Sequence, residues 1–181
     1  LGAREGRFSK SGETKSLVPF AASSIPLVTL GTFLLWFGWF GFNGFSQLAM
    51  GTFDDVNAIS KIAVNTHLAG AAGTVTAAVV SRLLGGKTDI IMMLNGALAG
   101  LVAITADPLS PTPLLAIAIG AIGSIIMYFG TKFLEARHLD DVVGAIPVHM
   151  FAGIFGTLVV PMSNSDTSFG TQFTGVISVC V

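Results

Sequence analysis

Residues 114–129 read LLAIAIGAIGSIIMYF, a run of sixteen residues without a charged side chain. Residues 30–42, LGTFLLWFGWFGF, show the same continuous apolar pattern. Transmembrane strands would alternate apolar and polar positions over about ten residues, and neither run does so. Lipid requires a spanning segment to satisfy its backbone polar groups internally, which a helix does. Both runs therefore predict membrane-spanning α-helices.

The composition of the chain extends this prediction to the whole molecule. Of its 181 residues, 52% are hydrophobic and only 10% are charged, whereas soluble domains carry about 25% charge. The net charge of -1 excludes a nucleic-acid-binding protein that relies on a basic surface. The single cysteine, Cys180, excludes an intrachain disulfide framework and a zinc site built on several thiolates. An integral membrane protein is indicated.

Five stretches are long enough to cross a hydrocarbon core about 30 Å thick, which takes about 20 residues of helix. We expect an all-α polytopic helical bundle and a single transmembrane domain over residues 1–181. The helices are expected at residues 24–50, 58–84, 88–106, 113–134 and 142–162, with a partial one at 170–181. Because the last stretch is short and the chain opens in a polar loop-like segment, we expect a piece of a longer protein.

The positive charges predict the orientation of the helices. Eight of the nine Lys and Arg residues fall before the first helix or in the turns near residues 82–87 and 132–137. The intervening loops around Asp54, Asp107 and Asp166 contain none, and Lys61 is the exception. The basic side should be cytoplasmic. The first helix therefore runs from inside to outside.

Small residues recur at spacings that allow helices to approach closely. Gly96 and Gly100 form a GxxxG pair, and other glycines lie three positions apart. In lipid, such glycines favour backbone contact between helices. The other spaced glycines are Gly38, Gly41, Gly44, Gly120, Gly123, Gly153 and Gly156.

An imidazole within a membrane helix is costly and therefore informative. His149 lies about eight residues into the fifth predicted helix, so about 12 Å deep at 1.5 Å per residue. A neutral imidazole donates from one nitrogen and accepts at the other. His149 could therefore relay a proton or line a path for a small polar molecule. A helix–helix hydrogen bond is the alternative.

The other two histidines favour simpler interpretations. His67 also lies at membrane depth, and we expect a structural role there, with Asn65 or Thr66 as polar partners. His138 sits beside Arg137 at the inner boundary and is expected to be a solvated loop residue. The three histidines do not have metal-ligand spacing, so no metal site is predicted.

Residues 34–47, LLWFGWFGFNGFSQ, alternate aromatic rings with glycines. Aromatic faces near an aqueous mouth attract cations, and the Ser46 hydroxyl could accept a hydrogen bond from a cationic N–H donor. An interfacial aromatic belt is the alternative. That alternative explains Trp36 and Phe37 better than Phe42 and Ser46.

Four segments together carry a family resemblance. They are GTFLLWFGWFGFNGFSQL (31–48), AVNTHLAGAAG (63–73), MMLNGALAGLVAITA (92–106) and DDVVGAIPVHMFAGIFGT (140–157). In this order and spacing the chain resembles the ammonium transporter family (Amt/Mep/Rh), over roughly its sixth to tenth transmembrane helices and the start of the eleventh. The resemblance implies one half of an inverted-repeat fold.

The resemblance also implies roles for individual residues. Phe42 matches a pore-gate phenylalanine, Ser46 the hydroxyl of the outer substrate-recruitment site, and His149 a histidine lining the pore. Trp39 matches a supporting tryptophan beside the gate. The implied function is transmembrane transport of ammonium or ammonia through a hydrophobic pore. Ammonium would be recruited at the outer aromatic and hydroxyl site and deprotonated before it passes the pore histidines.

Two alternatives stay open, namely an ammonium sensor of the same fold and a transporter of another small solute. An enzyme is not expected, because Asp107, Asp140 and Asp141 fall at helix ends rather than at matched depth with a nucleophile. No cofactor is expected. The resemblance implies a homotrimer in a plasma membrane or bacterial inner membrane, with a cytoplasmic P-II signalling protein as a further candidate partner.

Overall fold

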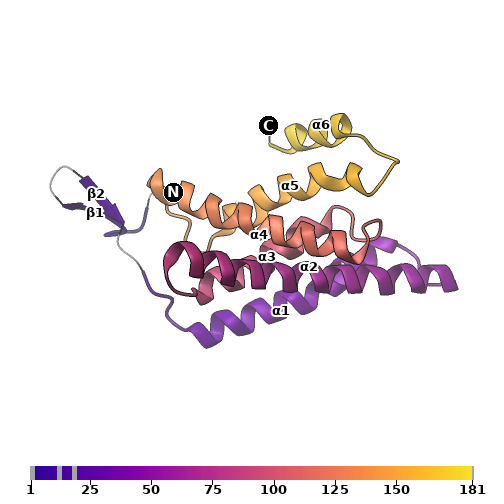
Figure 1. Cartoon of the computed structure of the whole chain (residues 1–181), viewed down its shortest axis with the longest axis horizontal. Helices are drawn as coiled ribbons and strands as arrows, with labels where there is room; N and C mark the ends of the chain where they lie inside the picture. Colours follow the sequence, from indigo (N-terminus) through magenta and orange to yellow (C-terminus); the bar gives the residue numbers. More distant parts are fainter. Residues whose placement is uncertain (1–2, 12–13, 18–19, 181) are drawn as a thin grey trace.

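The computed structural model describes residues 3–11, 14–17 and 20–180. A short antiparallel hairpin of β1 (Phe8–Ser11) and β2 (Thr14–Leu17) precedes the helices and projects from one end of the bundle (Figure 1). The main helices are α1 (Ile25–Gly44), α2 (Phe53–Gly85), α3 (Ile90–Thr105), α4 (Pro113–Ala136), α5 (Ala152–Val159) and α6 (Phe169–Cys180). Shorter turns are the 3-10 helices η1 (Phe45–Gln47) and η3 (Val160–Met162) and the π-helical turn η2 (Ile146–Phe151).

Three helical segments are long and apolar enough to cross a membrane, namely Ile25–Gln47, Phe53–Gly85 and Pro113–Ala136. Ile90–Thr105 and Ile146–Met162 are shorter apolar helices. These segments pack side by side (Figure 1). The expected all-α membrane bundle is confirmed, and the chain is a multi-pass membrane protein.

Two helices begin where local backbone chemistry places them rather than where hydropathy suggested. The α2 helix starts at Phe53, five residues earlier than expected, because Thr52 and Asp55 form a capping box. A capping box satisfies backbone N–H groups at the first turn and is independent of hydropathy. The fifth apolar segment starts at Ile146 rather than residue 142, because Gly144 takes a positive φ of 77°.

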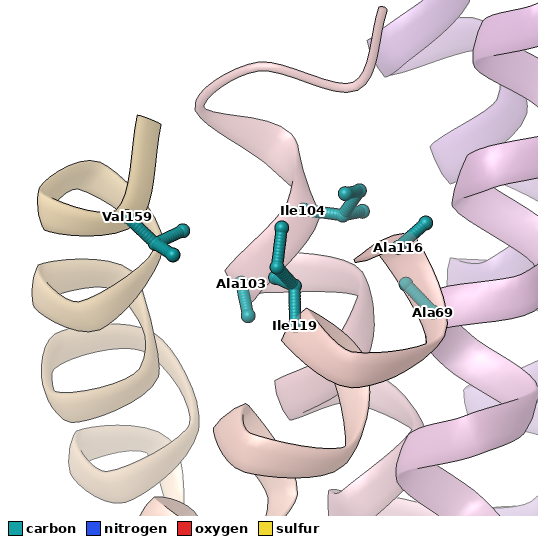
Figure 2. Packing of buried hydrophobic residues seen from close by; sticks show 6 residues of the cluster. All are labelled: Ala69, Ala103, Ile104, Ala116, Ile119 and Val159. Carbon is teal, nitrogen blue, oxygen red and sulfur yellow. The ribbon is translucent and has the colours of Figure 1, made fainter. Parts of the chain in front are cut away.

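The core consists of α2, α3 and α4, which meet at glycines. A methyl group on Gly73 would overlap the Gly96 carbonyl oxygen, and one on Gly100 or Gly120 would overlap the Ala69 carbonyl oxygen. The close approach expected from the glycine spacing is therefore observed in these helices. Apolar side chains fill the adjoining space (Figure 2). The cluster consists of Ala69, Ala103, Ile104, Ala116, Ile119 and Val159.

The α1 helix is packed much less tightly than this core. In its most apolar window 6% of the residues are buried, compared with 44% in α4. Leu34 and Leu35 are 63% and 53% exposed on its surface. Gly38, unlike the core glycines, has open space at its Cβ position. The α1 helix thus forms one wall of the bundle and leaves room beside it.

An ionic cluster ties the segment before the hairpin to the loop after α4. Arg4 donates through its backbone N–H and its Nε to one Asp140 oxygen at 2.9 and 2.8 Å, and through a terminal nitrogen to the other at 2.8 Å. Arg7 pairs with Glu135 at 3.3 Å, and Phe20 lies under both guanidinium groups. The cluster joins residues more than a hundred positions apart.

Candidate functional site

A cavity of about 590 Å³ lies between α1, α3 and the η2–α5 segment. The three faces are held together by direct packing of α3 against both α1 and α5. The lining is mostly apolar, and its polar groups are few. It consists of Leu34, Leu35, Gly38, Trp39, Phe42, Val102, Thr105, Ala106, His149, Gly153 and Thr157. We call this space the central cavity.

One end of the central cavity is organised by a hydrogen bond from α1 to α3. The indole Nε1 of Trp39 donates to the Thr105 hydroxyl at 2.7 Å. The Thr105 hydroxyl in turn donates to the Leu101 carbonyl at 2.7 Å. The Trp39 and Phe42 rings lie 6.2 Å apart at a tilt of 52°. Trp39 is therefore fixed at its polar edge and presents its ring beside Phe42.

His149 lies in the π-helical turn η2 and reaches the central cavity from the opposite wall. It also lines a second cavity of about 620 Å³, between the η2–α5 segment and α6. The expected depth of about 12 Å inside a regular helix is wrong, because the helical segment begins only three residues earlier, at Ile146. His149, Gly153 and Thr157 follow at intervals of four residues and share the cavity face.

The structure brings together three of the four residues singled out from the sequence. Trp39, Phe42 and His149 line the central cavity. Ser46 lies one turn beyond Phe42, in η1, where its hydroxyl donates to the Phe42 carbonyl at 3.2 Å. Ser46 is exposed and is absent from the cavity lining. It therefore stands at the end of α1, beyond the cavity.

His67 lies apart from the central cavity, on the outer side of α1 and α2. Its ring is 5.5 Å from that of Trp36 and 6.2 Å from that of Phe40. The partners expected for it bond elsewhere, since Thr66 accepts from Asn43 and Asn65 donates to the carbonyls of Pro108 and Pro111. That part of the interpretation is wrong, because both side chains point to other helices and loops.

His138 lies exposed in the turn after α4, as expected for a solvated loop residue. Its ring makes an edge contact with Phe8, 5.1 Å between centroids.

Hydrogen bonds from the Arg4 side chain and backbone lower the pKa of nearby Asp140 to about 2. Within the described ranges, no three His, Cys, Asp or Glu side chains gather as a metal site.

Sequence reasoning missed the residues that hold this site from α3. Thr105 and Asn95 are ordinary polar residues in an apolar helix, and their partners, Trp39 on α1 and Val143 in the loop before η2, are known only from the packed structure. The carbonyl of Val143 accepts from Asn95 at 3.1 Å. Thr157 was also missed, although its spacing of eight residues from His149 places it on the same helix face.

Comparison with known proteins gives the class. A model described as the Ammonium Transporter Family matches residues 1–177. The chain is 43% identical over 174 residues to the ammonium transporter Amt2 of Archaeoglobus fulgidus, covering 96% of this chain and 36% of that protein. Ammonium transporter 3 of Dictyostelium discoideum is 35% identical, covering 88% and 37%. The chain belongs to the ammonium transporter family.

Solved structures agree with this assignment. A structure titled "Sensor Amt Protein" matches with a TM-score of 0.89 and 35% identity, covering 98% of this chain and 45% of that one. The crystal structure of Candida albicans Mep2 matches with a TM-score of 0.79 and 25% identity, covering 93% and 40%. The chain spans just over a third of the length of the curated relatives and less than half of these structures.

Proposed function

We propose that this chain supplies one side of a pathway that moves ammonium across a membrane, as ammonia for at least part of the way. The single observation that supports this most is the central cavity, where Trp39, Phe42 and His149 converge on an apolar space. An imidazole there offers one donor and one acceptor nitrogen to a small polar molecule. The rest of the cavity lining is apolar apart from Trp39, Thr105 and Thr157.

The apolar lining favours a neutral species inside the cavity. Desolvating an intact cation in a low-dielectric space costs several kcal/mol even after relaxation. Ammonium that gives its proton to water at the exposed end of the path enters the cavity as ammonia and avoids most of this cost, and His149 would hydrogen-bond that ammonia. We propose Ser46 and Phe42 as the outer recruitment hydroxyl and the gate, with Trp39 supporting Phe42. This order follows α1 from its exposed end toward the cavity.

The test uses the gene that encodes this chain with its native flanking sequence, expressed in cells that lack their own ammonium transporters. His149→Ala should change the rate of methylammonium uptake or its selectivity over potassium, with normal amounts of protein in the membrane. His67→Ala is the matched control, because His67 is a membrane histidine outside the central cavity. Equal behaviour of His149→Ala and wild type would refute the proposal.

Variants of Ser46 and Phe42 separately test the two roles proposed at the outer site, recruitment and gating. Ser46→Leu should raise the apparent KM for methylammonium, because it removes the hydroxyl that would accept a hydrogen bond from the cation. Phe42→Ala should alter selectivity or maximal rate, since it opens the proposed gate. If Ser46→Leu left KM unchanged, the recruitment site would have to lie elsewhere.

An ammonium sensor of the same fold is the second candidate. It is favoured by one observation, the TM-score of 0.89 with the structure titled "Sensor Amt Protein". A transporter sustains uptake over many turnovers, whereas a sensor binds ammonium and changes the state of a partner domain. Uptake assays on the gene product expressed with its native flanking sequence distinguish the two. If the protein transported a different small solute, the uptake of that solute would not be inhibited by ammonium in the same assay.

We further propose assembly as a homotrimer in a plasma membrane or bacterial inner membrane, with a P-II signalling protein as a partner at the cytoplasmic face. The family resemblance supports these proposals. Size-exclusion chromatography with light scattering on the detergent-solubilised protein tests the trimer. Co-purification with P-II tests the partner.

A further inference from the structure

The hydrogen-bond ladder of the segment that carries His149 begins at the Gly144 carbonyl, which accepts from the Val148 N–H at 3.2 Å. The Val143 carbonyl lies one residue before this ladder, because Gly144 takes a positive φ, and Pro147 has no backbone N–H to offer it. The side-chain amide of Asn95, on α3, donates to this carbonyl instead, with an Nδ2···O distance of 3.1 Å. A residue from a different helix thus holds the carbonyl that directly precedes the turn.

The backbone at Gly144 makes room for this contact. Gly144 has a φ of 77°, which non-glycine residues rarely adopt. A Cβ atom there would lie 2.6 Å from the Asn95 Nδ2, closer than any real contact allows. The absence of a side chain at 144 therefore lets the amide reach the Val143 carbonyl.

The carboxylate of Asp141 fixes the other polar groups of the same turn. One oxygen accepts from the backbone N–H groups of Gly144 and Ala145 at 3.1 and 3.0 Å. The second oxygen accepts from Ile146 at 2.7 Å. Asp141 thus holds the N–H groups at the start of the turn, and Asn95 holds the Val143 carbonyl just before it.

The register of this turn determines where His149 points. The N–H of Ala152 is shared between the Pro147 carbonyl, five residues back as in a π-helix, and the His149 carbonyl, three residues back. Pro147 and Val148 are buried, with Pro147 packing against Gly130 on α4, while His149 is exposed to the central cavity. Relaxing the turn to an α-helix would shift His149 by one position relative to Gly153, about 100° and 1.5 Å.

We propose that Asn95 is a positioning residue for His149. Its amide holds the Val143 carbonyl, keeps the π-helical register of η2 and so keeps the imidazole facing the central cavity. The effect of Asn95 on transport depends on the function proposed above for His149. Asn95 itself lies away from the cavity lining, so it acts only through the turn.

Asn95→Leu tests this role in the gene with native flanking sequence, because leucine has a similar shape and no donor. We expect the maximal methylammonium uptake rate per molecule to fall roughly fivefold, the factor for one lost hydrogen bond of ordinary strength. The KM for methylammonium should stay the same, because the proposed recruitment residue Ser46 lies beyond the C-terminal end of α1, away from the turn that Asn95 contacts. Asn95→Ser, polar but too short to reach Val143, replaces the leucine variant if that one does not assemble.

Thr131→Val is the matched control. Thr131 shares a pocket with Asn95 near the start of η2, and its hydroxyl donates within its own helix, to Met127. It should leave uptake unchanged.

The double variant with His149→Ala distinguishes positioning from general structural support. If Asn95 acts through His149, Asn95→Leu should have no further effect once the imidazole is gone. An equal fivefold loss of uptake rate from Asn95→Leu, with His149 present and with His149→Ala, would overturn the positioning role. The role would also be overturned if Asn95→Leu left the uptake rate unchanged while His149→Ala changed it. A silent His149→Ala would instead refute the proposed function itself.

Discussion

The hydrogen bond between Trp39 and Thr105 predicts a measurable effect on transport. Thr105→Val preserves the side-chain shape and removes the hydroxyl that accepts from the Trp39 indole nitrogen at 2.7 Å. A partly buried N–H without a partner costs about 1–3 kcal/mol. At about 2 kcal/mol, the orientation that places Trp39 beside Phe42 loses a factor of about 30 in population. The maximal uptake rate should fall by up to that factor.

The assay is the initial rate of methylammonium uptake, normalised to the amount of protein in the membrane. Thr105→Ser is the matched control, because it keeps the acceptor and should retain most of the activity. In a Trp39→Phe background the Thr105→Val effect should largely disappear, since the donor is absent. Equal rates for the valine and serine variants would refute the reasoning, because the hydroxyl would then have no role in placing Trp39.

Three further predictions concern stability and orientation. Asp140, with its pKa lowered to about 2 from 3.8, should stabilise the fold above the higher value, and this contribution should be lost as pH falls toward about 2 in acid unfolding. Gly73→Ala should lower the melting temperature in detergent by overlap with the next helix, at a cost of about 1–3 kcal/mol, whereas Gly38→Ala should not. Cysteines replacing Lys87 and Asp107 should label from the cytoplasmic and outer sides, respectively.

Each of these has a specific control or contradicting result. Asp140→Asn should remove the part of the acid dependence that Asp140 contributes to the unfolding free energy, and an unchanged pH profile in that variant would exclude the ionic cluster as a source of it. A destabilised Gly38→Ala beside a stable Gly73→Ala would contradict the packing described for the core. Labelling of both cysteines from the same side would invalidate the orientation and the outer placement of Ser46.

The helices could be predicted from the sequence because lipid imposes one dominant requirement on a spanning segment. Continuous apolar runs predicted the main helices of the described residues. Gly96, Gly100 and Gly120 marked contacts of the core, whereas Gly38, Gly44 and Gly153, which are spaced in the same way, make no close approach. Helix starts were less predictable, since the start of α2 depends on the Thr52 and Asp55 capping box and that of η2 on Gly144 and Pro147. The hairpin and the pairing of Arg4 with Asp140 involve polar segments that hydropathy does not describe.

The candidate site could be predicted only where its residues are chemically unusual for a membrane helix. His149 is costly in lipid and therefore visible, and the family resemblance indicated Phe42, Ser46 and Trp39. The sequence alone could not indicate which residues hold these side chains in place. Thr105 and Asn95 lie in an apolar helix that faces different neighbours along its length, and their partners are known only once the helices are packed.

The position of α3 explains why it carries both of these supporting residues. The cavity walls come from α1 and from the η2–α5 segment, and α3 packs against both. Because α1 is mostly exposed, its hydrogen bond from Trp39 to α3 is one of few polar links that fix it. The contact of Asn95 with Val143 does the same for the opposite wall. The distance between the Phe42 ring and the His149 imidazole is therefore set by α3, which carries neither side chain.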